Sequence, residues 1–82
     1  MYTVYVLHSP KHNKIYIGYS NNVEARIISH NELGNKGWTR KYRPWELVHS
    51  EEFPTKKLAL ARERQLKSAQ GRKWIWDEIM SR

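Results

Sequence analysis

Residues 2–9 read YTVYVLHS and residues 14–20 read KIYIGYS, two short stretches rich in aromatic and β-branched side chains. Stretches of this kind are typical of β-strands. The four residues between them, PKHN at positions 10–13, have the composition of a turn. The chain is therefore predicted to begin with a β-hairpin.

A four-residue loop fixes the pairing of this hairpin. It places Leu7 opposite Tyr16 and Tyr5 opposite Gly18. Because side chains alternate between the faces of a strand, all four lie on one face. Most aromatic residues in strands belong to the core, but two phenols beside a glycine that leaves space also fit a polar pocket. Both interpretations stay open at this point.

A helix and a third strand are expected to follow. The helix starts from a cap at Asn21 or Asn22 and runs to about Leu33, where Gly34 ends it. Residues 45–53 are predicted to form the strand, which begins after a proline.

Two helices are predicted in the C-terminal third of the chain. The first is capped by Thr55 and ends near Ala69; Gly71 then interrupts the pattern, and the last helix starts near Arg72. The apolar residues of the last helix are expected to close the core: Trp74, Ile75, Trp76, Ile79 and Met80. The predicted fold is α+β, in the order β-β-α-β-α-α, with helices packed on a three-stranded antiparallel sheet.

The composition limits the possible functions. The 82 residues are enough for one domain, residues 1–82. A formal net charge of +7 favours nucleic acid as a partner over a membrane surface, although such a charge also serves solubility. The chain has no cysteine, which excludes disulfides and thiolate zinc sites. We see no signal peptide or membrane span in the sequence and expect a soluble, cytoplasmic protein.

Glu63 is the carboxylate that best suits a metal site. On its predicted helix it borders the stripe that faces the core, where a carboxylate loses hydration and needs a partner. An ion pair with Arg62 or a lysine is one interpretation, and a ligand for Mg²⁺ or Mn²⁺ is the other. Asp77 is the only aspartate in the chain, so a single-metal site fits better than a two-metal site.

Arg26 and His30 lie four residues apart on the first predicted helix and share one side of it. Arginine can bind two phosphate oxygens, and histidine can donate to a phosphate or transfer a proton. A surface arginine and a hydrogen-bonded structural histidine are the alternatives. Tyr5 or Tyr16 could act as a base, if Arg26, Lys14 or a metal lowers the phenol pKa from about 10, or as a nucleophile.

The segment 36–43 mixes cationic and aromatic side chains. This composition suits phosphate contacts combined with base stacking. A solvated loop anchored by a buried Trp38 is the competing interpretation. The expected nucleic-acid contacts are Lys14, Lys36, Trp38, Arg40, Lys41 and Arg43.

Taken together, these features resemble the GIY-YIG nuclease domain. The tripeptide TVY at 3–5 resembles the first signature of that family, with a threonine in place of its glycine, and YIG at 16–18 matches the second. Arg26 falls where the family has its catalytic arginine, His30 matches a histidine of many members, and Glu63 matches the metal-binding glutamate.

The resemblance implies a metal-dependent endonuclease that hydrolyses DNA phosphodiester bonds. It implies that Tyr5 is the general base and that Tyr16 assists it. It further implies that Arg26 stabilises charge on the phosphate, while Glu63 holds Mg²⁺ or Mn²⁺. Activity in DNA repair, recombination or the processing of foreign DNA is expected.

One departure from the family pattern indicates weaker substrate positioning or a reduced member of the family. Many members carry an asparagine beyond the glutamate, whereas no asparagine follows Asn35 here. The alternative is a non-catalytic nucleic-acid-binding module on the same scaffold, and a third possibility is an interaction domain whose charge serves solubility. We see no separate DNA-binding domain, so we expect targeting by structure-specific recognition, a homodimer or a partner protein.

Overall fold

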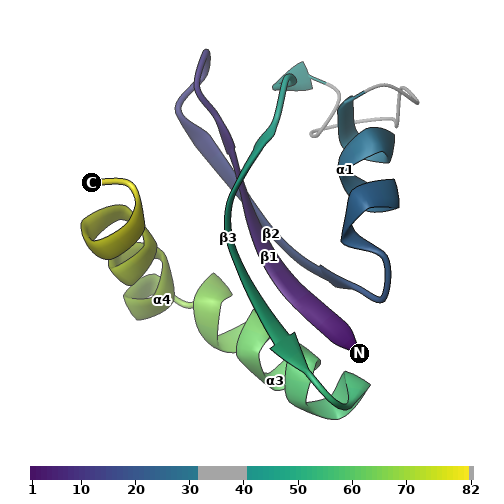
Figure 1. The fold of residues 1–82 in the computed structure, drawn as a ribbon. Helices are drawn as coiled ribbons and strands as arrows, with labels where there is room; N and C mark the ends of the chain where they lie inside the picture. Colours follow the sequence, from purple (N-terminus) through teal and green to yellow (C-terminus); the bar gives the residue numbers. More distant parts are fainter. Residues whose placement is uncertain (32–40, 82) are drawn as a thin grey trace.

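Three strands form one antiparallel sheet in the order β2-β1-β3 (Figure 1). The computed structural model describes residues 1–31 and 41–81. The strands are β1 (Tyr2–Ser9), β2 (Lys14–Ser20) and β3 (Glu46–Phe53). Because β1 is central and both of its faces are covered, four consecutive residues of this strand are buried.

The hairpin of β1 and β2 has the predicted register. Tyr5 pairs with Gly18, and Leu7 pairs with Tyr16. Asn13 closes the turn with a φ of 53°, a left-handed conformation that asparagine adopts more readily than most residues. A register shift occurs only in the pairing of β1 with β3, so it leaves the alternation of side chains along the hairpin unchanged.

Helices cover both faces of the sheet (Figure 1). On one face lies α1 (Val23–Asn31), and on the other lie α3 (Lys56–Lys67), α4 (Ala69–Trp74) and the π-helix η1 (Ile75–Ile79). The α1 face is packed around Tyr5, Leu7 and Trp45. The opposite face is packed around Val4, Val6, Ile15, Ile17, Ala59, Leu66 and Ile75. The predicted α+β fold and its element order are confirmed. In the described part of the chain, no helix has the length and apolarity that crossing a bilayer requires.

Side-chain caps begin α1 and α3, as predicted. The Asn22 side-chain oxygen accepts from the N–H of Ala25 at 3.2 Å, and the Thr55 hydroxyl accepts from the N–H of Leu58 at 3.2 Å. Such caps satisfy backbone donors that have no partner inside the helix. The predicted end of the first helix, near Leu33, lies outside the described residues.

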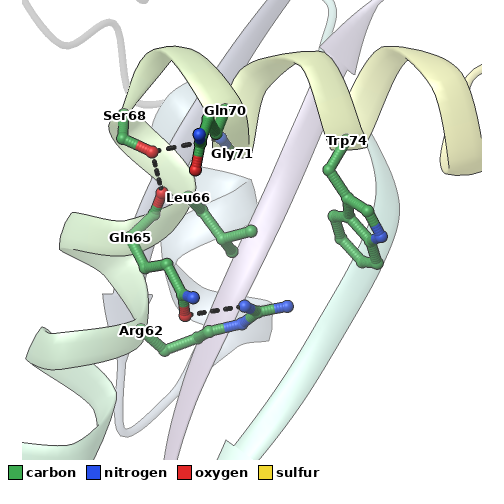
Figure 2. A pocket seen from close by; sticks show the side chains of 7 residues that line it. All are labelled: Arg62, Gln65, Leu66, Ser68, Gln70, Gly71 and Trp74. Carbon is green, nitrogen blue, oxygen red and sulfur yellow. Dashed lines mark hydrogen bonds between the residues drawn. The ribbon is translucent and has the colours of Figure 1, made fainter.

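The prediction that the second helix ends near Ala69 is wrong: α3 ends at Lys67. The hydroxyl of Ser68 donates to the carbonyl oxygen of Gln65 at 2.6 Å and accepts from the N–H of Gly71 at 3.1 Å (Figure 2). One side chain therefore ends α3 and caps the start of α4.

The predictions for Gly71 and Trp74 also need correction. Gly71 does not interrupt the last helix but lies inside α4, which begins before Arg72. A Cβ at Gly71 would overlap the carbonyl oxygen of Gln65, so glycine is needed where the two helices meet. Trp74 is 37% exposed and does not close the core, whereas Ile75 is buried. The remaining apolar residues pack against the core as expected: Trp76, Ile79 and Met80.

Candidate active site

Tyr5 is fully buried and reaches across β2 at Gly18. A Cβ on Gly18 would stand 2.7 Å from the Tyr5 hydroxyl oxygen and 3.0 Å from the ring of Tyr16. Any larger residue would displace these phenols. The rings of Tyr5 and Tyr16 stack with centroids 6.3 Å apart. The two tyrosines share a face as predicted, but the end of Tyr5 fills the space at Gly18 that was expected to be open.

Arg26 brings a positive charge to both phenols. Its guanidinium interacts with the Tyr5 hydroxyl as a hydrogen-bond donor and as a cation, and more weakly with Tyr16. The hydrogen bond with Tyr5 is the main reason why the pKa of Arg26 is raised above its ordinary value. Arg26 is also exposed to solvent, so the same group that contacts Tyr5 can contact a phosphate.

The condition for Tyr5 to act as a base, a phenol pKa below its ordinary value, is not met by the protein's own residues. Burial raises the pKa of Tyr5 above its ordinary value of 10.0, although the hydrogen bond and charge of Arg26 act in the opposite direction. The charge of Glu63 adds to the rise. Lys14, expected as a second source of positive charge, instead lies over the ring of Tyr42, with 5.7 Å from Nζ to the ring centroid. At neutral pH the Tyr5 side chain is therefore a neutral phenol.

Glu63 approaches this centre from α3. Its charge is one of the causes that raise the pKa of Tyr5, so the carboxylate lies close enough to act on that phenol. The side chain of Glu63 is 17% exposed, and its Oε1 lies 3.7 Å from Nζ of Lys67. Of the two partners foreseen for an ion pair, the lysine is present, while Arg62 pairs with Glu51.

Glu63 is the one acidic side chain that the described residues bring to this centre, and its neighbour is a lysine. Among the described residues, no three histidine or acidic side chains gather into a metal-binding group. Mg²⁺ commonly keeps several waters and takes one or two carboxylates together with substrate phosphates. Glu63 with a phosphate and water would meet that requirement. Lys67 is the cation that neighbours the carboxylate in this structure.

Several predicted site residues lie wholly or partly outside the described part of the chain. His30 belongs to α1, one turn after Arg26, but its side chain is among the undescribed groups. The predicted nucleic-acid contacts Lys36, Trp38 and Arg40 lie outside the described residues altogether. Their roles stay predictions.

The other predicted nucleic-acid contacts gather where β1 turns into β2. Lys14 and Lys41 both approach the ring of Tyr42, with 5.7 Å and 5.5 Å from Nζ to the ring centroid. Arg43 donates to the carbonyl oxygen of Asn31 at 3.2 Å, which ties the segment before β3 to the end of α1. The two lysines lie around the ring of Tyr42. Tyr42 itself packs against the core on the α1 face of the sheet.

Two hollows beside β2 were missed in the sequence. The first hollow, of about 450 Å³, is lined by Tyr2, Tyr19, Ser20, Asn21, Arg26 and Lys56. The second hollow, of about 250 Å³, is lined by Ile15, Tyr16, Ile17, Lys67 and Arg72. One signal was available: Lys56 and Lys57 occupy the first turn of α3, where the helix dipole disfavours positive charge.

A third hollow, of about 300 Å³, lies between α3 and α4 (Figure 2). Arg62 lines it and donates to both carboxylate oxygens of Glu51 at 2.9 Å and 3.0 Å, and to Gln65 at 2.8 Å. Its guanidinium also stacks on Trp74, 5.3 Å from the ring centroid. The charge of this arginine is already neutralised, so we assign the hollow a structural role.

Comparison with known proteins agrees with this geometry. Residues 1–75 match the GIY-YIG catalytic domain family, and the chain belongs to that family. It is 43% identical over 65 residues to a UPF0213 protein of Natronomonas pharaonis, which covers 79% of this chain and 75% of the relative. A UPF0213 protein of Staphylococcus haemolyticus is 43% identical over 58 residues, 71% of each chain. A UPF0213 protein of Bacillus velezensis is 40% identical over 55 residues, 67% of this chain and 56% of the relative. The resemblance inferred from the signatures is confirmed, while the name UPF0213 states no activity.

Proposed function

We propose that this protein is an endonuclease that hydrolyses DNA phosphodiester bonds with Mg²⁺ or Mn²⁺. The observation that carries the proposal is the convergence on one phenol: Arg26 contacts the Tyr5 hydroxyl, and the charge of Glu63 reaches the same group. Membership in the GIY-YIG family supports a nucleic-acid substrate and nuclease chemistry.

The proposed reaction adds the oxygen of water to phosphorus and breaks the bond between phosphorus and a sugar oxygen. Water loses a proton to a base, and the departing sugar oxygen gains one. Arg26 is placed to offset the negative charge that grows on the phosphate oxygens. Tyr5 can accept this proton only when it is a phenolate. Arg26 favours the phenolate, and burial opposes it. A divalent cation held by Glu63 supplies positive charge that lowers the pKa of nearby water and hydroxyl groups.

We place the biological role in DNA repair, recombination or the processing of foreign DNA. A homodimer or a partner protein would then direct the domain to its substrate. The high positive charge of the chain supports capture of a polyanion.

Nicking of supercoiled DNA tests the proposal, with single-stranded and branched DNA as further substrates. With Mn²⁺ present, Arg26→Ala and Glu63→Ala should each lower the rate by at least about 10²-fold, the usual loss for a group that stabilises transition-state charge. Arg64→Ala, an exposed arginine on the same helix as Glu63, should nick like the wild type. Equal activity in all four proteins would mean that cleavage comes from another centre or a contaminant.

The second candidate is a non-catalytic nucleic-acid-binding module. Two observations favour it: Tyr5 is fully buried in its neutral form, and Lys67 lies beside the carboxylate that would hold the metal. This candidate predicts DNA binding that weakens steeply with salt. It also predicts that the wild type shows no metal-dependent nicking.

A further inference from the structure

The two hollows beside β2 lie on either side of the candidate active site. Along β2, residues 15–17 line the second hollow and residues 19–21 line the first. The residue between these two sets is Gly18, over which the Tyr5 hydroxyl lies. The centre proposed for hydrolysis therefore borders both hollows, since Arg26 also lines the first and Tyr16 the second.

The same order appears along α3, which runs beside β2. Lys56, at the start of the helix, lines the first hollow, and Lys67, at its end, lines the second. Glu63 lies between them. At about 1.5 Å per residue, Lys56 and Lys67 are separated by about 16 Å along the helix axis. Two independent elements thus give the same sequence of hollow, centre and hollow.

We propose that the two hollows beside β2 form a binding track for one DNA strand, with a phosphate site in each hollow on either side of the scissile phosphate. The inference rests on the proposed function, because the centre of the track is the proposed site of hydrolysis. One strand of B-DNA carries a charge every 3.4 Å or so along the axis. A span of about 16 Å is several times this rise, so the two hollows can hold different phosphates of the same strand.

Each hollow offers more than one donor to an anion. In the first, Arg26 and Lys56 come from different helices, and the Ser20 hydroxyl, which accepts from the N–H of Asn22 at 2.9 Å, still has a hydrogen to donate. In the second, Lys67 is joined by Arg72, whose Nε donates to the Lys67 carbonyl at 3.2 Å. That bond holds the guanidinium of Arg72 at the end of α3, beside the hollow that it lines.

Helix stability does not account for the lysine in the first hollow. The first turn of α3 contains no acidic residue, although a negative charge there would be favoured by the helix dipole. A cation at this position weakens the helix slightly, and the same charge strengthens an anion site. Lys57 shares this turn, so what distinguishes Lys56 is that it lines the first hollow.

Two pairs of neighbouring cations provide matched variants. Lys56→Gln and Arg72→Gln each remove a charge that lines a hollow, whereas Lys57→Gln and Lys73→Gln remove an adjacent charge that lines neither. Affinity for fluorescent duplex and single-stranded oligonucleotides is measured in EDTA, which prevents cleavage, across a range of salt concentrations.

Lys56→Gln and Arg72→Gln should each reduce the slope of log affinity against log salt by about 0.9 on duplex DNA and about 0.7 on a single strand. At 0.1 M salt this corresponds to a loss of affinity of about eightfold on duplex DNA. The two control variants should bind like the wild type. Equal slopes for each variant and its neighbour would overturn the track.

The outcome for the track can be separated from the outcome for hydrolysis. In one outcome the wild type does not nick DNA, and Lys56→Gln and Arg72→Gln lose salt-dependent affinity while their controls do not. The proposed hydrolysis then fails and the track stands. If the wild type nicks DNA and Lys56→Gln is indistinguishable from Lys57→Gln in both KM and affinity, hydrolysis stands and the track fails.

Discussion

Two regions of this protein contain the same types of side chain but use them differently. One combines Arg26 and Glu63 with the phenols of Tyr5 and Tyr16 at the edge of β2. The other combines Arg62 and Glu51 with His49 and Trp74 beside β3. We call the first the β2-edge cluster and the second the β3-edge cluster.

In the β3-edge cluster the charges satisfy one another. Arg62 binds both oxygens of Glu51, and Nε2 of His49 lies 2.6 Å from one of those oxygens. Arg62 and His49 also pack on Trp74. An arginine and a carboxylate in a bidentate pair have little capacity left for a substrate.

In the β2-edge cluster the arginine contacts neutral phenols, and its positive charge is not cancelled by them. Glu63 has a single lysine at 3.7 Å in place of a bidentate partner. The difference between the clusters lies in how the charges are paired, since the side-chain types are alike. Perturbed pKa values, as at Tyr5 and Arg26, cluster at sites that act on substrates.

The largest expected effect comes from removing one hydroxyl from the β2-edge cluster. Tyr5→Phe should lower the nicking rate by about 10²–10⁴-fold, because it removes the group that would act as general base or as nucleophile. The ring remains to fill the core, so thermal unfolding should show a folded protein. Rates like those of the wild type would exclude Tyr5 from both roles.

The next effect should appear in stability and not in activity. Arg62→Ala breaks the bidentate pair of the β3-edge cluster and leaves Glu51 without its main partner. The side chains of Arg62 and Glu51 are each about one-quarter exposed, which moderates the loss. We expect the free energy of unfolding, measured with urea, to fall by about 2–3 kcal/mol. Arg64→Ala, an exposed arginine on the same helix, should cost little. Nicking per folded molecule should be unchanged in Arg62→Ala; a loss as large as that of Arg26→Ala would remove the distinction between the clusters.

The hairpin at the centre of the β2-edge cluster could be predicted because its determinants are local. Alternation along the strands and the length of one turn were enough to pair Tyr5 with Gly18. The starts of α1 and α3 were equally predictable, since a cap depends on a side chain within three residues, whereas the Ser68 cap of α4 was missed. Asn22 and Thr55 both act at the expected positions.

The chemistry of each cluster could not be read from the sequence, because it depends on tertiary contacts. Arg62 and Glu63 are adjacent in sequence, yet Arg62 pairs with Glu51 on a strand and Glu63 lies beside Lys67. Whether nearby positive charge lowers the pKa of Tyr5 could not be decided from the sequence for the same reason. Sequence showed that a cation would be near, but only the structure showed that burial outweighs it.

The smallest expected effect is a pH dependence that belongs to the β3-edge cluster alone. Burial opposes the charged form of Glu51, but the hydrogen bonds and charges of Arg62 and His49 prevail and lower the pKa of Glu51 below its ordinary value of 4.5. The unfolded state therefore binds this proton at a higher pH than the folded state does. The resulting stability is present above the unfolded pKa and is lost as the pH falls through the folded pKa.

Glu51→Gln removes this titration and should cost about 1–2 kcal/mol at neutral pH, measured by urea unfolding. The difference from the wild type should shrink as the pH falls below about 4.5, where the unfolded carboxyl becomes protonated. Glu52→Gln, an exposed neighbour on β3, provides the background. A difference for Glu51→Gln that stayed constant down to pH 2 would mean that the carboxylate contributes through packing, and the β3-edge cluster would then not be held together by paired charge.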